Sequence, residues 1–499
     1  MERMIVSNQV LRNAAAASSQ ALVSGLLLFC LYKYLLATIG VEKVGIWSTV
    51  LATTTMTRLT ELGLTGSVVK FVAKYRAYGD QPAVVSVVET AIISIGLGIG
   101  LAGLLLLPVI SYALKHVMDL SAYAVAAGLL PYAILSLWMN SVCGVVQGAL
   151  DGCQRADKRS LVTLFSNFAF VAAVPVLVPK HGLLGLAYAQ IGQGIIVLVV
   201  TWYQLRKHVI GLRFLRLRWS GLRFREMFRY GLAFQASTLA QLAFDPVTKA
   251  LLSKFGGLTS VGYYEMASRM VTQVRALIVS ANQVVVPLMA EMKESAPEQI
   301  HRVYLNNYRA MVLLCILGAG ALIALAPMIS ILWIGKISTE FVTSVFLLTI
   351  GWTINTLTVP AFFANQGLGN LGINTVSSFG IAMLNVVLGV ALGWLFAGTG
   401  VVLGWALALA IGSAAIPVEF HRQQGLSLRL LIPLESRHVL VVTFITVALC
   451  LMVYVVSGTY GHPVAGALVM LLIFPLGVCI PIWNHPLRNA TVAKWTRTR

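Results

Sequence analysis

Charged residues are scarce in this chain, and their scarcity excludes most soluble folds. Only 11% of the 499 residues are Asp, Glu, Lys or Arg, whereas a typical soluble domain has about 25%. Hydrophobic residues make up 58% of the chain, and its mean hydropathy is +0.85. Apolar runs long enough to cross a bilayer recur along its whole length. Because these runs are near-continuous rather than alternating, we predict an all-α, polytopic membrane protein.

The signals of a catalytic site are also missing. The sequence contains no His-Glu-x-x-His motif, no Asp-x-Asp motif for a metal-bound sugar nucleotide and no P-loop. Its six cysteines form no Cys-x-x-Cys pair, which is typical of small buried hydrophobic residues rather than of a redox site. A membrane glycosyltransferase or polymerase would need a carboxylate-bearing soluble loop, and we find none. We therefore expect a transporter that is not an enzyme and that uses no cofactor and no metal.

A cleavable signal peptide is not evident, because the small residues 14–19 precede the first apolar run instead of following it. We expect this run to remain as a membrane helix, the first of about fourteen. The predicted spans are residues 12–37, 44–68, 83–112, 122–149, 160–179, 183–205, 229–253, 261–289, 308–334, 341–364, 373–396, 400–420, 438–457 and 462–483.

Basic residues set the predicted orientation of these spans. The net charge is +19, and the Lys and Arg residues cluster at both ends and in alternate loops, whereas the opposite loops hold mostly single lysines. Loops rich in Lys and Arg stay in the cytoplasm, so both termini are predicted to be cytoplasmic. Membrane topology thus accounts for the excess of basic residues, and we do not expect nucleic acid as a partner.

The chain also repeats itself. Val44-Gly45 returns as Val261-Gly262 at a spacing of 217, and Gly182 is matched with Gly400 at a spacing of 218. A nearly constant offset predicts two pseudo-symmetric lobes of six helices each. Since six is even, both lobes start on the same side of the membrane, which indicates a parallel repeat.

This repeat divides the chain into four parts. We predict an N-terminal lobe at 1–205, a basic linker at 206–228, a C-terminal lobe at 229–420, and two further helices with a basic tail at 421–499. The linker mixes Arg with Leu, Phe and Trp. It can lie in the membrane interface on anionic headgroups or form an ordinary cytoplasmic loop, and the sequence leaves both open.

Several charged residues are predicted at membrane depth, where hydrocarbon cannot solvate them. Arg58 and Arg275 occupy equivalent places in the two lobes, so we expect them to face each other across the repeat axis. Two converging guanidinium groups repel each other unless an anion lies between them, and the planar Arg donor fork matches phosphate oxygens. This pair therefore predicts a site for an anionic ligand.

The other charges at depth include two pairs at helical spacing, and each pair has two interpretations. Lys249 lies four residues after Asp245, and Arg269 lies four residues after Glu265. Such pairs can simply hold helices together. Alternatively, Lys249 and Arg269 contact an anionic substrate, while Asp245, Glu265 and Glu61 couple transport to an ion by becoming neutral. Pro246 is expected to kink or break its helix.

Polar residues complete the candidate site. Lys33 lies near the outer end of the first span, where it can snorkel to the interface or contact the substrate. Gln20, Gln241 and Asn140 can bind sugar hydroxyl groups, although bridging between helices is the commoner use of such residues in membranes.

Scattered motifs lie over about residues 10–420, at 40–48, 61–65, 147–155, 182–185, 222–231, Asp245 with Leu251-Leu252, and 261–287. In combination they resemble the polysaccharide-unit flippases of the multidrug/oligosaccharidyl-lipid/polysaccharide exporter superfamily.

The resemblance implies a function and a location. It implies a central cavity and alternating access, with Arg58, Arg269 and Arg275 holding the diphosphate of an undecaprenyl-linked oligosaccharide. This cargo would be flipped from the cytoplasmic to the periplasmic leaflet of a bacterial inner membrane, for O-antigen, capsule or exopolysaccharide synthesis. Membrane lipids and polysaccharide polymerase or assembly proteins would be its partners.

Two alternatives within the superfamily stay open. One is a cation-coupled multidrug antiporter, although the acidic residue that such exporters typically carry in the first helix is missing here. The other is a lipid II-type flippase, in which two extra C-terminal helices also occur.

Overall fold

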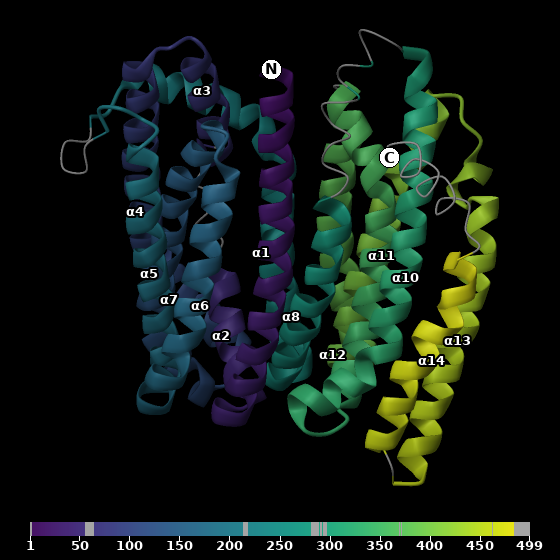
Figure 1. Cartoon of the computed structure of the whole chain (residues 1–499). Coiled ribbons are helices and arrows are strands. Elements are labelled where there is room, and N and C mark those ends of the chain that lie inside the picture. Colours follow the sequence, from purple (N-terminus) through teal and green to yellow (C-terminus); the bar gives the residue numbers. More distant parts are fainter. Residues whose placement is uncertain are drawn as a thin grey trace. The chain divides into compact units, whose positions relative to one another are not determined.

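A computed structural model describes residues 2–54, 64–212, 218–280, 289, 292, 297–368, 370, 372–461 and 463–483 (Figure 1). Every regular element in these ranges is an α-helix or a short 3-10 helix. The chain divides into two compact units, Met1–Gly262 and Tyr263–Arg499.

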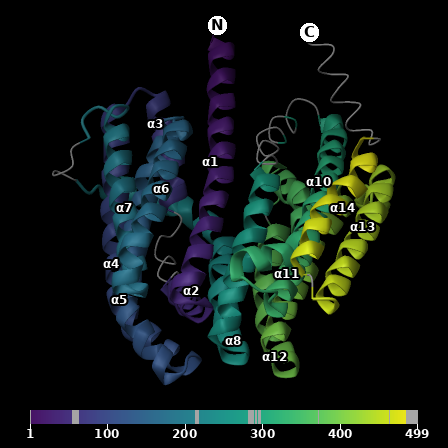
Figure 2. The same cartoon turned by 60° about the horizontal axis from the view of Figure 1, so that its bottom comes forward.

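The first unit is a bundle built around α5. Helix α5 packs against α3, α4 and α7, while α6 packs against both α1 and α7 (Figure 2). The helices are α1 (Glu2–Ile39), α2 (Val41–Thr54), α3 (Leu64–Ala77), α4 (Gln81–Val117), α5 (Leu120–Gly152), α6 (Ala156–His181), α7 (Leu183–Arg206) and the first part of α8 (Gly221–Ser280).

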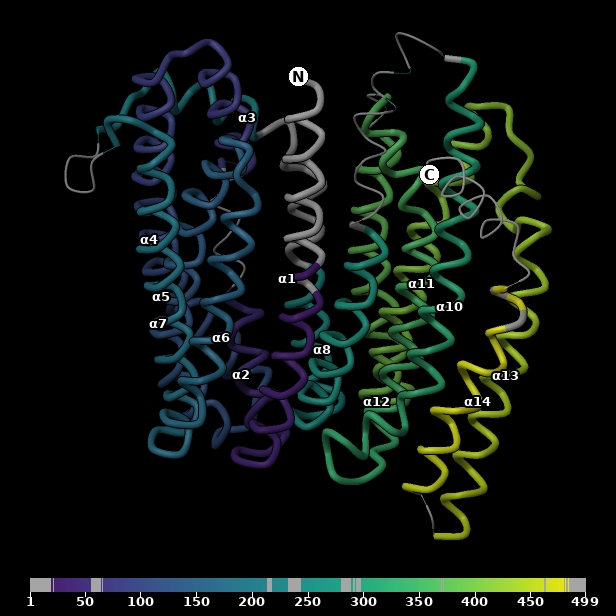
Figure 3. Tube along the Cα trace, in the orientation of Figure 1, coloured from purple at the N-terminus to yellow at the C-terminus, as the bar shows by residue number. Residues whose placement is uncertain are grey.

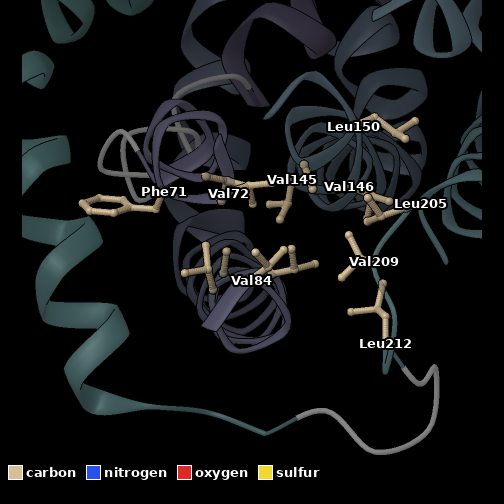
Figure 4. Packing of buried hydrophobic residues seen from close by; sticks show 14 of the residues in the cluster. Phe71, Val72, Val84, Val145, Val146, Leu150, Leu205, Val209 and Leu212 are labelled. Atoms are coloured by element: carbon tan, nitrogen blue, oxygen red, sulfur yellow. The ribbon is translucent and has the colours of Figure 1, made fainter. Parts of the chain in front are cut away.

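Part of the predicted linker belongs to the core of this unit. Val209 and Leu212, which follow α7, are 1% and 2% exposed and pack among buried residues of α3, α4 and α5 such as Val84 and Val145 (Figure 4). Burial of such side chains stabilises the packing by roughly 1.5–3 kcal/mol each. The beginning of the linker is therefore fixed to the bundle by its apolar residues.

The second unit is organised around α10. Helix α10 contacts α11, α13 and α14, and the last two pack together as a hairpin (Figure 3). The elements are η2 (Pro297–Gln299), α10 (Ile300–Ile334), α11 (Thr339–Leu368), α12 (Gly372–Gln423), η3 (Leu428–Leu431), α13 (Leu434–Thr459) and α14 (Pro463–Trp483).

Two of the helices are interrupted by non-helical residues. In α8 the interruption is Gly257, with φ 75° and ψ 173°, so two helices meet there. Pro246 was predicted to kink or break its helix; the backbone dihedrals stay helical there, so the helix is not broken at this proline, and a kink stays a prediction. Proline is tolerated inside membrane helices because neighbouring groups satisfy the freed carbonyl. Glycine, with no Cβ, adopts the positive φ of the real break at no steric cost.

The interruption in α12 repeats one between α6 and α7. Gly182 has φ 56° and ψ −131°, and Ala397 has nearly the same pair, φ 51° and ψ −140°. Three residues later, Gly185 and Gly400 each lie directly against a carbonyl of the preceding helix. The local offset is 397 − 182 = 215 residues, so the match of Gly182 with Gly400 is three residues out of register. This one backbone break therefore recurs in each unit.

The predicted all-α, polytopic class with about fourteen segments is confirmed. The order of spans is the predicted one when α8 and α12 are counted as two helices each and α2 and α3 are counted together as one span. Within the described ranges, nine helices are long and apolar enough to cross a membrane. The lobe boundaries at 205 and 229 were placed by the repeat rather than by packing, and they stay a prediction.

Glycines allow a close helix crossing inside the first unit. A Cβ on Gly45 would collide with the carbonyl of Leu258, and a Cβ on Gly262 would collide with the carbonyl of Val41. Small residues let membrane helices approach closely enough for backbone contact. The crossing holds α2 against the start of the second helix of α8, which carries most of the candidate site.

Candidate functional site

The charged residues of α8 pair as their spacing predicts. Arg269 Nε donates to Glu265 Oε1 over 2.7 Å, with the Glu265 side chain 6% exposed and the Arg269 side chain 52% exposed. The pair keeps the carboxylate neutralised in the protein and leaves much of the guanidinium accessible. Arg269 can therefore reach a ligand without leaving Glu265 uncompensated.

Arg275, two turns further along α8, lies in a different environment. Its Nη2 donates to Asn355 Oδ1 over 3.0 Å, and its Cζ lies 4.1 Å from the centre of the Trp352 ring. Trp352 is in turn packed edge-on against Trp405 of α12. Both partners of Arg275 are neutral, and across the part of the chain the structure describes we find no carboxylate paired with it.

A small cavity adjoins Arg275 inside the second unit. Its volume is about 20 Å³, and α8, α10 and α11 line it. The lining residues are Val271, Val274, Arg275, Ile278, Cys315, Gly318, Ala319, Leu322, Thr349, Trp352, Thr353 and Thr356. The cavity has room for about one water-sized species.

In the first unit, the Asp245–Lys249 pair is also formed. Lys249 Nζ lies 2.7 Å from Asp245 Oδ2, with the lysine side chain 5% exposed and the aspartate 50% exposed. The burial is the reverse of the Glu265–Arg269 pair, because here the cation is enclosed and the carboxylate is accessible. Both pairs hold successive turns of α8 together, and neither arrangement tests a role in ion coupling.

The remaining predicted site residues are scattered. Lys33 is exposed on α1, and Gln20 is half-buried on the same helix. Asn140 is exposed on α5, and its amide nitrogen donates to the carbonyl of Ser136 within that helix. Arg58, Glu61 and the side chain of Gln241 lie outside the described residues. The predicted meeting of Arg58 with Arg275 therefore stays a prediction.

The linker is anchored by contacts that residue types alone did not indicate. Glu89, a buried acid of α4 with no base nearby in the sequence, accepts a hydrogen bond from the backbone N–H of Arg218. The backbone N–H of Ser220 donates to Thr90 Oγ1, and Trp219 Nε1 donates to Ser94 Oγ. These bonds fix residues 218–220 against α4.

A charged cluster then attaches the start of α8 to α3. Tyr75 Oη donates to Glu226 over 2.7 Å, and Lys74 Nζ and Arg223 Nη1 each lie 3.2 Å from the same carboxylate. Burial raises the pKa of Glu226, but these hydrogen bonds outweigh it and hold the pKa below its ordinary value. We call the contact of Glu226 with Lys74, Tyr75 and Arg223 the clamp between α3 and α8. The clamp depends on an ionised Glu226.

Sequence analysis did not identify two of the residues that surround Arg275. Trp352 and Thr349 of α11 line the cavity, yet neither carries a charge or belongs to a motif. The only available signal was a tryptophan within an apolar span, which is usually core. A metal site is not indicated either: in the described ranges, no three His, Cys, Asp or Glu side chains lie together.

Solved structures establish the fold. The chain is similar to an inward-facing multidrug resistance MATE family transporter of the MOP superfamily, with a TM-score of 0.73 and 14% identity, over 82% of this chain and 98% of that one. It is also similar to lipid II flippase MurJ in an inward closed conformation, with a TM-score of 0.70 and 14% identity, over 94% and 97% of the two chains.

A third structural match and a family match complete the comparison. A MOP superfamily transporter from Pyrococcus furiosus matches with a TM-score of 0.60 and 14% identity, over 83% of this chain and 95% of that one. No curated protein matches the chain. A family model described as "Polysaccharide biosynthesis protein" matches residues 10–293, which is more than half of the sequence. The chain is thus a multi-pass helical membrane protein with the fold of MOP superfamily transporters, and it belongs to the polysaccharide biosynthesis protein family.

Proposed function

We propose that this protein is a flippase that moves polyprenyl-diphosphate-linked oligosaccharide from the cytoplasmic to the periplasmic leaflet by alternating access. The family match supports a role in polysaccharide biosynthesis, for O-antigen, capsule or exopolysaccharide. The fold, shared with transporters and with a lipid II flippase, supports movement of a lipid-linked molecule rather than its chemical conversion. Both termini would lie in the cytoplasm of a bacterial cell.

The observation that carries the proposed cargo is the position of Arg275. A guanidinium at membrane depth costs at least about 2.5–3.5 kcal/mol to insert unless something compensates its charge. Arg275 has a neutral amide and an aromatic ring as partners, and Arg269 on the same helix is half exposed. A diphosphate headgroup supplies the missing negative charge and the oxygens that arginine binds in pairs. In this proposal the glycan contacts polar side chains while the polyprenyl tail stays in lipid.

A cellular test uses a bacterium whose own repeat-unit flippase has been deleted. The wild-type protein is expected to restore surface glycan, whereas Arg275→Gln and Arg58→Gln should each reduce it strongly in correctly inserted protein. Arg302→Gln is the matched control, because Arg302 is exposed at the start of α10 and should not bind the diphosphate. Full glycan export by both variants would refute the proposed role of the two arginines.

The same strains separate the alternatives. Cation-coupled multidrug antiport is favoured by one observation, the half-exposed carboxylate of Asp245 beside its buried lysine. Resistance to cationic drugs without rescue of surface glycan would support that function and contradict ours. A lipid II-type flippase, to which the match over 94% of the chain points, would instead rescue cells that lack their peptidoglycan-precursor flippase.

A further inference from the structure

The cavity beside Arg275 contains more hydrogen-bond donors than acceptors. Three of its lining side chains have a buried nitrogen or oxygen with no hydrogen-bond partner within the described residues: Arg275 Nε, Thr349 Oγ1 and Trp352 Nε1. Guanidinium Nε and indole Nε1 can only donate, and the threonine hydroxyl can donate as well. A buried donor left unpaired destabilises the folded protein, and a charged one does so more strongly.

The charge of the cavity lining is equally unbalanced. Among the described residues that line it, Arg275 is the sole ionised side chain, since the other eleven are apolar, Cys or Thr, or the neutral Trp352. The Asn355 oxygen satisfies one of the five N–H groups of the guanidinium. Trp352 offers the face of its ring to the cation, and this contact leaves the indole N–H at the ring edge free for another acceptor.

We propose that this cavity is a binding site for a small monovalent inorganic anion of the halide class, with chloride as its ordinary occupant. One ion would accept from Arg275, Thr349 and Trp352 and would compensate the guanidinium charge. Water fits the volume of about 20 Å³ too, but water carries no charge and leaves the arginine uncompensated.

This inference goes beyond the flippase function and does not depend on it, because halide binding is measured without cargo. The purified full-length protein is crystallised in bromide, and anomalous scattering locates the ion. We expect a bromide peak within hydrogen-bonding distance of Arg275 Nε and Thr349 Oγ1. Density without anomalous signal at that place would mean a water molecule and would overturn the proposal, as would density from a lipid headgroup.

A pair of threonines provides matched variants for a solution test. Thr349 and Thr356 both line the cavity and are 1% and 2% exposed, but the Thr356 hydroxyl already donates to the carbonyl of Trp352. Thr349→Val keeps the shape of the side chain and removes an unpaired donor. Thr356→Val makes the same change without removing a free donor.

The solution test follows the thermal stability of detergent-solubilised protein as sodium chloride replaces sodium gluconate at constant ionic strength. Chloride that binds the folded state raises the unfolding temperature with a saturable midpoint. We expect Thr349→Val to shift this midpoint at least about tenfold higher, because the variant lacks one of the three donors to the ion. Thr356→Val should leave the midpoint unchanged. Equal midpoints in the wild type and Thr349→Val, or no chloride dependence in the wild type, would refute the site.

Discussion

Arg275 illustrates how a single membrane-buried cation is accommodated by neutral groups. The Asn355 oxygen and the Trp352 ring together stabilise the guanidinium, and a desolvated cation–π contact contributes about 2 kcal/mol or more. Neither partner cancels the charge. The residue is therefore held in place but remains able to attract an anion, which is the property that both of our proposals use.

The depth of Arg275 was predictable from sequence, whereas its partners were not. An arginine within a long apolar run is visible without a structure. Asn355, however, lies 80 residues away on α11, and only the packing of α8 against α10 and α11 brings the two together. Trp352 and Thr349 have no distinguishing pattern at all. Their unpaired donors become apparent only when the atoms around them are known.

Backbone strain at one alanine leads to a prediction about stability. Ala397 has φ 51° and ψ −140°, a conformation that glycine adopts freely and that other residues adopt at a cost of about 1–3 kcal/mol. Gly182 holds the equivalent place in the first unit. We expect Ala397→Gly to stabilise the protein by about 1 kcal/mol and Gly182→Ala to destabilise it by at least as much.

Thermal unfolding in detergent measures both effects on stability. The control is Ala391→Gly, an exposed position in regular helix of α12, where the same change should destabilise by about 0.5–1 kcal/mol. Destabilisation by Ala397→Gly as large as that of the control would show that Ala397 is not strained.

Among the helices, the boundaries followed the sequence closely except at one proline. Long apolar runs predicted the spans because length and hydropathy alone decide whether a helix can cross a bilayer. The interruption of α8 fell at Gly257 rather than Pro246. A proline removes one hydrogen bond, which a packed membrane helix can tolerate, whereas a positive φ ends the helix locally. Gly257 lies in the gap between the predicted spans 229–253 and 261–289, so the ends of the apolar runs located the interruption and the proline did not.

The clamp between α3 and α8 predicts a dependence on pH. The pKa of Glu226 lies below its ordinary value in the folded protein, where Tyr75, Lys74 and Arg223 bind its carboxylate. A carboxyl whose folded pKa is lowered stabilises the protein fully above its unfolded pKa, and that contribution disappears as pH falls through the folded pKa. We therefore expect Glu226→Gln to destabilise this contact by about 1 kcal/mol at neutral pH and to have no effect at strongly acidic pH.

Hydrogen exchange of α3 and the start of α8 reports the opening of this clamp directly. The exchange of Glu226→Gln should be faster than that of the wild type at pH 7, and the difference should vanish on acidification. Glu298→Gln serves as the control, because Glu298 is exposed in η2 of the other unit. A difference between the wild type and Glu226→Gln that persists unchanged at low pH would show that the charge of Glu226 does not hold the contact.

At the scale of the whole molecule, the sequence indicated an internal repeat, but it aligned the two halves incorrectly at one position. Matching residues at a spacing near 218 indicated two related halves, and the dihedral angles of Gly182 and Ala397 agree with this. The residue equivalent to Gly182 in the second unit is Ala397, which is not a glycine. Matching by residue type therefore paired Gly182 with Gly400, three residues further along the chain. Geometry is retained at this break although the residue type is not.

The central claim is that the protein flips a polyprenyl-diphosphate-linked oligosaccharide, and transport in a purified system tests it most directly. The protein is reconstituted into vesicles that contain a fluorescent lipid-linked oligosaccharide, and an impermeant reagent added outside measures how fast label from the inner leaflet becomes accessible. We predict rapid and nearly complete access with the wild type and with Arg302→Gln. Arg275→Gln should flip the lipid at least about tenfold more slowly, which corresponds to the loss of about 1.4 kcal/mol of binding to the diphosphate. Inner-leaflet label that stays protected with the wild type, or a rate for Arg275→Gln equal to that of the wild type, would contradict the account.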